Sequence, residues 1–335
     1  MIFIVGSSRS GTTMMGDVLG RNARVFTFQE LHFFEQLWTP GDTGPLSEDE
    51  QVGLAARLLC VQREGYLTHG SESAYDREAR DVLAQPMSVD SALPDALRVY
   101  RAVLAYETVR QGAQRPCEQT PRNVLYLREI LDHFPEAQVV NMVRDPRDVL
   151  LSQKGKWRRR YLGHPDTPLS ETVRARINYH PYTVSKLWRA SVTAARAFEG
   201  DPRVCTVRYE DLVHAPDETV ARLCDFLGLD YEPAMLAVPQ VGSSDARDDT
   251  ADLGINASRA LRWKRGGLSS TERYIAQATN ADFIEAYRYE EDPVQPSWLK
   301  VTGAYALAPV QLGVALMANL HRIRNLRETL RRRLT

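Results

Sequence analysis

A glycine-rich turn near the start of the chain carries the residue types of an anion-binding site. It runs from Gly6 to Gly11, after the apolar run Met1–Val5 and before an apolar-periodic segment at 12–19. A strand, a tight turn and a helix in this order direct backbone N–H groups and the positive end of a helix dipole to one point. The usual ligand at such a point is phosphate. The predicted binding residues are Ser8, Arg9, Ser10, Gly11, Thr12 and Thr13.

The spacing of the two glycines matches the phosphate loop of nucleotide triphosphatases, but the residues that follow do not. That loop continues with a lysine for the β- and γ-phosphates and a hydroxyl for magnesium. Here Thr12 takes the lysine position and the cation is Arg9. The sequence therefore predicts a ligand less charged than a triphosphate, bound without a metal ion. The alternative is an ordinary turn between a strand and a helix.

An acid and a histidine follow the second strand candidate, 25–28. They are Glu30 and His32, in the run Glu30-Leu31-His32-Phe33-Phe34. Open α/β sheets bind ligands at the carboxyl ends of their strands, so both side chains are placed for chemistry beside the glycine-rich turn. The alternative is an acid at the start of a helix and a half-buried histidine.

A second pair of anion-binding residues follows the buried strand predicted at 138–143. Arg144 stands at the end of this strand, and Ser152 lies about two helical turns further along the next helix. An arginine fork and a hydroxyl that converge in this way suit a second phosphate. The alternative is a surface cluster of ion pairs in which an aspartate caps the helix.

Short apolar runs alternate with helical segments along the chain. This alternation predicts a three-layer α/β fold, with a central parallel sheet flanked by helices. A single domain is expected over 1–300, and within it 39–115 is predicted as a mainly helical insertion and candidate acceptor-binding region, broken near Pro86 and Pro94. The strands are predicted at 1–5, 25–28, 138–143 and 204–207.

Composition narrows the classes of function. The formal net charge is −1, so no field-driven affinity for nucleic acid is expected. The chain enters its first strand without a charged leader, which favours a cytoplasmic protein. The oligomeric state is left open. The cysteines have neither C-x-x-C spacing nor nearby histidine clusters and are interpreted as buried thiols in a reducing compartment: Cys60, Cys117, Cys205 and Cys224.

The last 35 residues, 301–335, are predicted as an apolar and then basic helical tail. Residues 301–320 carry no charge, and arginines follow as far as Arg333. Pro309 makes the segment a poor membrane span. Two interpretations remain open. One is a basic helix in peripheral contact with a membrane, with its arginines on anionic headgroups. The other is an apolar helix docked on the core, with a solvated basic end.

Together these motifs resemble those of the sulfotransferases that use 3′-phosphoadenosine 5′-phosphosulfate (PAPS). The resemblance covers most of the chain as far as about Glu290. The run 8–13 resembles the loop that holds the 5′-phosphosulfate. Arg144 with Ser152 resembles the motif that holds the 3′-phosphate. The run 208–212 resembles the element whose tyrosine, here Tyr209, contacts adenine.

The run 263–267 is similar to the late basic loop that closes on the 3′-phosphate in this family. The resemblance therefore adds Lys264, Arg265 and Gly266 to the expected donor-binding residues. It implies a P-loop-type fold, PAPS as the sulfuryl donor, PAP as the product, a hydroxyl-bearing acceptor and no required metal.

The run Glu30-Leu31-His32-Phe33-Phe34 is similar to the Glu-x-His-Phe-Phe segment of the glycan (heparan-type) branch, whose glutamate is the catalytic base. The resemblance implies Glu30 as the base and Arg9 as a catalytic cation. His32 is the alternative base, because small-molecule sulfotransferases use a histidine, although theirs lies elsewhere in the chain.

Two departures from that branch bear on the acceptor. The branch has lysines where this chain has Gln29 and Gln119, and their loss favours a neutral acceptor. Lys154, Lys156 and Arg158 are candidate substitutes, besides Arg9. A glycan, a lipid alcohol, a secondary metabolite and a protein tyrosine all remain open as acceptors.

Two other functions are compatible with a glycine-rich phosphate loop. A P-loop kinase of a small hydroxyl compound would carry a lysine at position 12 and a magnesium carboxylate, and position 12 is Thr12. A nucleotide-binding module without turnover would not need a carboxylate at Glu30 that points at the donor. The sequence therefore favours the sulfotransferase.

Overall fold

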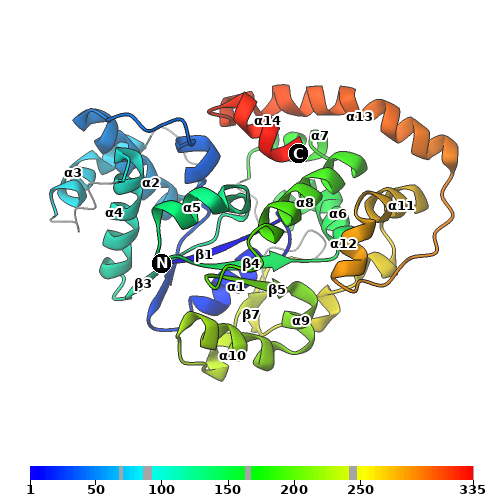
Figure 1. Cartoon of the computed structure of the whole chain (residues 1–335), viewed down its shortest axis with the longest axis horizontal. Coiled ribbons are helices and arrows are strands. Elements are labelled where there is room, and N and C mark those ends of the chain that lie inside the picture. The colour runs from blue at the N-terminus through cyan, green and yellow to red at the C-terminus, as the bar shows by residue number, and fades with distance from the viewer. Residues whose placement is uncertain (68–70, 86–92, 163–166, 241–246, 335) are drawn as a thin grey trace.

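The fold is built on a central sheet of five parallel strands in the order β2-β3-β1-β4-β5. Figure 1 shows the computed structural model, which describes residues 1–67, 71–85, 93–162, 167–240 and 247–334. The sheet contains β1 (Ile2–Gly6), β2 (Val25–Thr27), β3 (Arg115–Glu118), β4 (Gln138–Val143) and β5 (Val204–Arg208). β1 lies at the centre, so the loop that follows it opens at the middle of the sheet edge.

Helices cover both faces of the sheet because β1 is buried on both sides. Ile2 and Ile4 point into one apolar cluster, whereas Phe3 and Val5 point into the other. The first cluster is closed by α1 (Thr12–Leu19), α9 (Tyr209–His214) and α10 (Pro216–Leu227). The second contains residues of α2 (Glu48–Glu64), α4 (Asp95–Arg110), α5 (Leu127–His133) and α8 (Pro181–Arg196). The predicted three-layer α/β fold is confirmed (Figure 1).

Strand β3 was missing from the sequence prediction. Its sequence, Arg-Pro-Cys-Glu, combines a proline with charged ends, so it has no apolar run. Pairing with β2 and β1 makes it a strand, since Val25 lies opposite Arg115 and Ile2 lies opposite Cys117. The helical part of the insertion predicted at 39–115 therefore ends before β3, at Arg110.

The insertion packs as one group of helices beside β3 (Figure 1). It contains α2, η2 (Glu72–Tyr75), α3 (Asp76–Ala84) and α4. The break predicted at Pro94 is present, because this residue precedes the first turn of α4. The break predicted near Pro86 lies outside the described residues. Before the insertion, the run after β2 forms the short π-helical turn η1 (Phe33–Leu37).

The remaining helices connect the strands or follow the sheet. Between β3 and β5 lie η3 (Pro121–Tyr126), α6 (Pro146–Gly155), η4 (Lys156–Tyr161) and α7 (Leu169–Ile177), in addition to α5 and α8. After α10 come η5 (Pro233–Leu236), η6 (Ala257–Arg259), η7 (Arg262–Arg265), α11 (Ser270–Thr279) and α12 (Ala281–Ala286). A small antiparallel pair, β6 (Pro239–Gln240) and β7 (Asp249–Leu253), lies apart from the main sheet.

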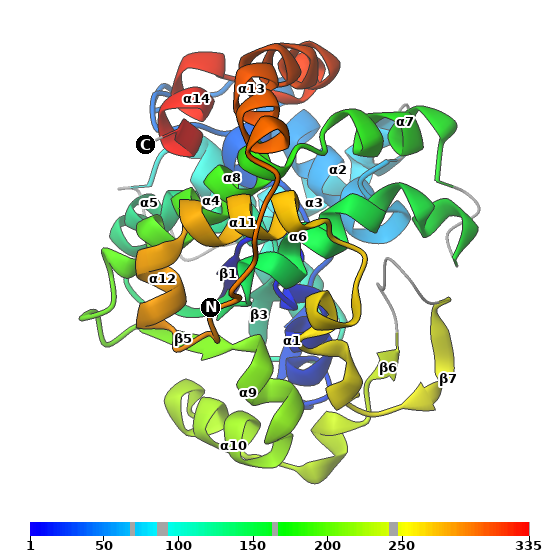
Figure 2. The ribbon, with the colours of Figure 1, turned by 90° about the vertical axis from the view of Figure 1, so that its right-hand side faces the viewer.

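The tail folds back over the molecule as two helices joined by η8 (Leu320–Arg322) (Figure 2). α13 (Trp298–Asn319) crosses α7, α8 and α11, and α14 (Leu326–Leu334) reaches α8. At Arg332 and Arg333 the structure differs from both predicted arrangements of the basic end. Arg332 pairs with Glu129, and Arg333 pairs with Glu35 at 2.5 Å, so these arginines are held by the core. The exposed part is the apolar helix α13.

Candidate functional site

A cleft of about 850 Å³ lies at the carboxyl ends of β1 and β4, and we call it the main cleft. Residues from the glycine-rich turn, the run after β2, α6, and the start of α9 all line it. The structure therefore brings together segments that are far apart in the sequence. The predicted site residues that line the main cleft are Ser8, Arg9, Gly11, Thr12, Thr13, Glu30, His32, Arg144, Ser152 and Tyr209.

The glycine-rich turn needs its glycines for close packing and for its backbone shape. A Cβ on Gly6 would lie 2.2 Å from the carbonyl oxygen of Met142, and one on Gly11 would lie 2.5 Å from the Tyr209 ring. Gly11 has φ +93° and Arg9 has φ +77°, and such positive values turn the chain sharply. The N-cap of α1 is Gly11, which has no side chain to cap the first turn, so the N–H groups of this turn are available to an anion.

The two predicted anion sites meet at Arg9. Its Nε donates a hydrogen bond of 2.9 Å to Ser152 Oγ, and its carbonyl oxygen accepts one of 3.3 Å from Arg144 Nη1. The loop after β1 and the helix after β4 are thus connected directly. Ligand groups bound at the two sites would lie on the same side of the sheet edge.

Arg144 is held in a fixed orientation. Its Nη2 donates to the carbonyl oxygen of Arg259 at 2.8 Å and pairs with Asp148 at 3.4 Å. Its guanidinium carbon lies 4.2 Å from the centroid of the Tyr209 ring. Trp188 Nε1 donates to the Arg144 carbonyl oxygen at 3.0 Å. A planar, fixed guanidinium is suited to bidentate recognition of phosphate.

The carboxylate of Glu30 lies in the main cleft with 40% of its side chain exposed. Surrounding protein raises the pKa of Glu30 by desolvation, and the cations of Lys156 and Arg122 oppose this shift. Solvent screens part of the effect because the side chain is partly exposed. A carboxylate whose pKa is raised is a stronger base than an ordinary one.

His32 lies beside Glu30, with 3.4 Å between its Nε2 and Glu30 Oε2. Burial lowers the pKa of His32 to about 3, and the nearby cations of Arg122 and Lys156 add to this. The imidazole is therefore neutral at physiological pH. Its ring centroid lies 4.4 Å from that of Tyr66, an insertion residue that also lines the main cleft. This packing fixes the imidazole next to the carboxylate.

A buried carboxylate, Glu118, holds the backbone that carries Glu30 and His32. Its Oε1 accepts from Leu31 N at 3.4 Å and from Thr120 Oγ1, and Thr120 Oγ1 accepts from His32 N at 3.3 Å. Burial raises the pKa of Glu118 to about 7. The end of β3 thus positions the catalytic candidates, which the sequence could not show because this strand was not predicted.

Lys156 is a site residue that the sequence prediction considered only as a substitute for the missing lysines. It lines the main cleft and interacts electrostatically with Glu30 and Arg9. Desolvation and the neighbouring charge of Arg9 lower the pKa of Lys156 to about 8. The available signal was its spacing from Ser152, because residues four apart share one side of a helix.

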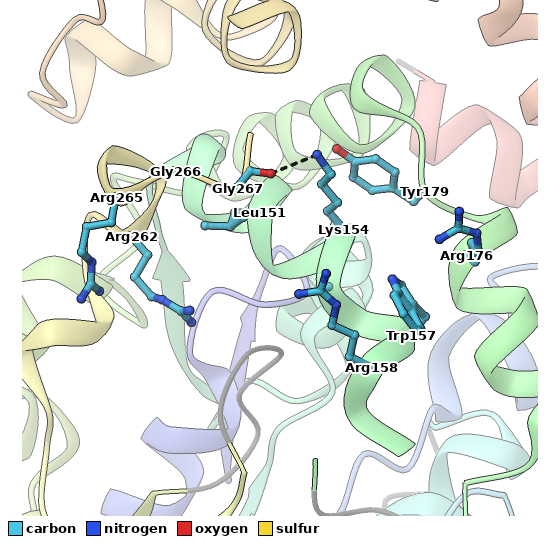
Figure 3. A pocket seen from close by; sticks show the side chains of 11 residues that line it. Leu151, Lys154, Trp157, Arg158, Arg176, Tyr179, Arg262, Arg265, Gly266 and Gly267 are labelled. Carbon is cyan, nitrogen blue, oxygen red and sulfur yellow. Dashed lines mark hydrogen bonds between the residues drawn. The ribbon is translucent and has the colours of Figure 1, made fainter. Parts of the chain in front are cut away.

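The late basic loop is placed differently from the other motifs. Arg265 and Gly266 line a second cavity of about 740 Å³, shown in Figure 3, which we call the basic cavity. Lys264 lines neither cavity and pairs with Glu290 instead. Arg262 lines both cavities. Of this loop, the structure brings Arg262 rather than Lys264 to the main cleft.

Two buried donor atoms belong to residues of the two predicted anion sites. Ser10 Oγ and Arg144 Nε are buried and have no hydrogen-bond partner within the described part of the chain. Ser10 belongs to the glycine-rich turn and is fully buried. Two donors without acceptors, one beside each predicted anion site, fit a molecule that carries phosphates at two separate positions.

Comparison with known proteins agrees with this geometry. A family model described as the sulfotransferase family matches residues 2–233, which include the glycine-rich turn, Glu30, Arg144, Ser152 and Tyr209. The nodulation protein NoeE of Sinorhizobium fredii (strain NBRC 101917 / NGR234) is 26% identical over 237 residues, 69% of this chain and 50% of that protein. The chain therefore spans about half the length of this curated relative.

Two solved structures share the fold. The sulfotransferase domain of the olefin synthase from Synechococcus PCC 7002 has 23% identity and a TM-score of 0.51, over 87% of this chain and 95% of that chain. The sulfotransferase domain from the curacin biosynthetic pathway has 20% identity and a TM-score of 0.53, over 87% of this chain and 98% of that chain.

Proposed function

The chain belongs to the sulfotransferase family, and from this membership we propose that it transfers a sulfuryl group from PAPS to a hydroxyl of an acceptor, with Glu30 as general base. The observation that carries the proposal is the meeting of three features in one cleft. These are the N–H-rich turn after β1, the fixed guanidinium of Arg144 beside Ser152, and the carboxylate of Glu30. A nucleotide with phosphates at both ends of its ribose matches the first two.

The roles of the residues follow from their positions. The turn 8–13 and Arg9 would hold the 5′-phosphosulfate, and Arg144, Ser152 and Arg262 the 3′-phosphate. Tyr209 presents its ring at the Arg144 side of the cleft, where adenine would pack. PAPS, when bound, supplies a sulfuryl group whose sulfur–oxygen bond to the phosphate breaks as the acceptor oxygen bonds to sulfur.

Glu30 takes the proton that the acceptor hydroxyl loses. Neutral His32 orients this carboxylate, and its lowered pKa makes it too weak a base to compete with Glu30 for the proton. Arg9 and Lys156 stabilise the negative charge that develops on the leaving phosphate, because they are cations beside the transfer point. Catalysis then rests on positioning and charge stabilisation.

The helical insertion supplies one wall of the same cleft. Tyr66 and Leu67 line the cleft, and Gln62 Oε1 accepts a hydrogen bond of 2.9 Å from Gln29 N. This placement supports the insertion as the acceptor-binding part of a single domain. The acceptor would enter between the insertion and the run Glu30–His32.

The test of the function is a calorimetric titration of the purified protein with PAP in the absence of magnesium, with ATP plus magnesium as the comparison. We expect micromolar binding of PAP and no magnesium-dependent binding of ATP. Binding of ATP with magnesium and none of PAP would instead identify a P-loop kinase. PAP binding without any turnover of PAPS over a panel of glycan, lipid and phenolic acceptors would identify a binding module.

We also propose that α13 contacts the surface of a membrane that contains anionic lipids. Among the described helices, Trp298–Arg322 is the one with the length and composition of a membrane span. Only 11% of its most apolar segment is buried. Large apolar side chains form an exposed stripe along it, at Leu299, Leu307, Val310, Val314, Met317 and Leu320. Lys300 stands at one end and exposed Arg327 at the other, which complements anionic headgroups, whereas Arg324 pairs with Asp42 at 2.7 Å.

A vesicle assay tests this contact. We expect the protein to cosediment with vesicles of phosphatidylcholine and phosphatidylglycerol, and Val310→Glu to weaken binding about 10–100-fold, because burying one such side chain is worth about 1.5–3 kcal/mol. Val109→Glu is the matched control, since Val109 is 73% exposed on the distant helix α4. A concentration-dependent dimer that Val310→Glu dissociates, without vesicle binding, would show that the stripe meets a second copy instead.

A further inference from the structure

The basic cavity has no role in the proposed function beyond Arg262, which also lines the main cleft. At about 740 Å³ it has the size of a small-molecule site, for which about 300–1,000 Å³ is typical. It lies beside the main cleft, because Leu151, Trp157 and Arg262 line both. Figure 3 shows that its walls come from the end of α6, η4, the end of α7 and the loop 262–267.

The lining of the basic cavity is strongly cationic. Its cations are Lys154, Arg158, Arg176, Arg262 and Arg265, and no carboxylate side chain is among the lining residues that the structure describes. The charge of Lys154 is compensated by Glu272, because its Nζ lies 2.8 Å from Glu272 Oε2. Arg158 and Arg176 have no carboxylate partner within the described ranges. Like charges gathered at one cavity repel, and an anion bound there would relieve the repulsion.

Two of these arginines share one aromatic ring. The guanidinium carbons of Arg158 and Arg176 lie 5.4 and 5.8 Å from the centroid of Trp157, and Figure 3 shows the ring standing between them. Contact with the ring keeps both guanidinium groups at the cavity. It does not use their N–H donors, which stay available to a ligand. Tyr179 adds a second aromatic side chain to the same wall.

The donor does not need this cavity. Both of its phosphate sites lie in the main cleft, at the glycine-rich turn and at Arg144 with Ser152. Arg158 and Arg176 line only the basic cavity. Trp157 belongs to both and is the residue next to Lys156, which stands beside Glu30. A substrate that extends from Glu30 past Trp157 would therefore reach the two arginines.

We propose that the basic cavity binds an anionic group of the acceptor, a sulfate, phosphate or carboxylate, while the acceptor hydroxyl lies at Glu30. This inference rests on the proposed function and deepens it, since it makes the acceptor an acidic molecule. It also replaces the neutral acceptor that Gln29 and Gln119 favoured. The positive charge missing at those two positions is supplied from α7 and η4 instead.

The test uses the full chain saturated with PAP, so that both phosphate sites of the main cleft are filled, and titrates it with sodium sulfate at constant ionic strength. The readout is the indole N–H signal of Trp157 in an NMR spectrum, assigned with Trp157→Phe. We expect a saturable shift, and we expect Arg158→Gln and Arg176→Gln each to weaken it about tenfold or more, because each removes charge-assisted hydrogen bonds.

The variants are chosen to keep the fold and the donor site intact. Both arginines are exposed, and Arg128→Gln, on the exposed side of α5, is the control that removes the same charge away from both cavities. Unchanged PAP affinity in Arg158→Gln and Arg176→Gln supports the proposal. A loss of PAP affinity equal to the loss of sulfate affinity would overturn it, because the cavity would then belong to the donor. The absence of a saturable sulfate shift would overturn it as well.

Failure of this proposal and failure of the proposed function are distinguishable. PAP binding by the unaltered protein is measured first, and its absence removes the proposed function and the acceptor assignment together. PAP binding without a sulfate site removes only the inference about the basic cavity. The titration is then repeated with sn-glycerol 3-phosphate and with phosphatidylglycerol vesicles. A shift of the Trp157 signal with sn-glycerol 3-phosphate indicates a soluble acidic acceptor. A shift with the vesicles alone indicates a lipid headgroup.

Discussion

Glu30→Gln is expected to lower kcat by about 10²–10⁴-fold, the usual contribution of a general base, while the affinity for PAP stays unchanged. Glutamine keeps the shape of the side chain and its contact with His32, but it cannot accept the proton of the acceptor hydroxyl. Sulfuryl transfer from radiolabelled PAPS measures the first quantity, and calorimetric titration with PAP measures the second.

The pH profile gives a second readout of the same residue. A base must be deprotonated, so kcat/KM should rise with pH through the pKa of Glu30. Desolvation raises that pKa, so the acid limb of the profile should lie above the ordinary value for a glutamate. In Glu30→Gln this limb should disappear from the residual activity.

Two further variants decide the assignment. Asp17→Asn removes another carboxylate that lines the main cleft and should leave turnover intact. His32→Gln keeps a polar side chain beside Glu30. It should lower kcat less than Glu30→Gln does, because His32 positions the base and does not accept the proton. Full turnover in Glu30→Gln together with its loss in His32→Gln would make His32 the base.

Arg144→Ala should weaken PAP binding by about 10–150-fold, since a hydrogen bond to a charged group is worth about 1.5–3 kcal/mol. The side chain is only 11% exposed, and its guanidinium is fixed by Asp148 and by the Arg259 carbonyl oxygen. Its loss therefore removes an oriented donor from the 3′-phosphate site. Calorimetric titration with PAP, compared with adenosine 5′-phosphosulfate, isolates the contribution of the 3′-phosphate.

Removing a buried arginine also disturbs its neighbours, so milder variants accompany it. Arg144→Lys keeps the charge but loses the planar fork, and it should recover only part of the affinity. Ser152→Ala removes a single hydroxyl. It should weaken the binding of PAP and leave the binding of adenosine 5′-phosphosulfate, which lacks the 3′-phosphate, unchanged. Arg128→Ala, at an exposed position on α5, is the matched control for the lost charge. If Arg144→Ala weakened the binding of PAP and of adenosine 5′-phosphosulfate equally, the assignment of Arg144 to the 3′-phosphate would be contradicted.

The sequence by itself determined the local structure at the centre of the molecule. Met1–Val5 is apolar at every residue and 138–143 at four of six, and a strand covered on both faces buries such runs. The glycines of the turn also have a local reason, because Gly11 adopts a positive φ that other residues avoid. These features depend on a few neighbouring residues, and sequence spacing records them directly.

The main cleft was predictable for the same reason. Residues that directly follow parallel strands meet at one sheet edge, whatever the length of chain between them. Arg9, Glu30, Arg144 and Tyr209 each follow a strand or lie just beyond one, and all four line the cleft. Their individual roles stay predictions, which the substitutions above test.

Only the tertiary structure decided the features that depend on long-range packing. β3 has no strand-like sequence and exists because β1 and β2 pair with it. Lys264 and Arg262 are two residues apart, and the fold alone sends one to Glu290 and the other to the main cleft. The basic end of the tail pairs with Glu35 and Glu129, which lie some 200 to 300 positions earlier.

The basic cavity has the same origin. Arg158 and Arg176 belong to separate helices, and each alone is an ordinary solvated cation in the sequence. Their charges meet only because η4 and α7 pack against each other around Trp157. Electrostatic interactions depend on distance in space rather than along the chain. A sequence therefore specifies the charges, and the fold determines which of them act together.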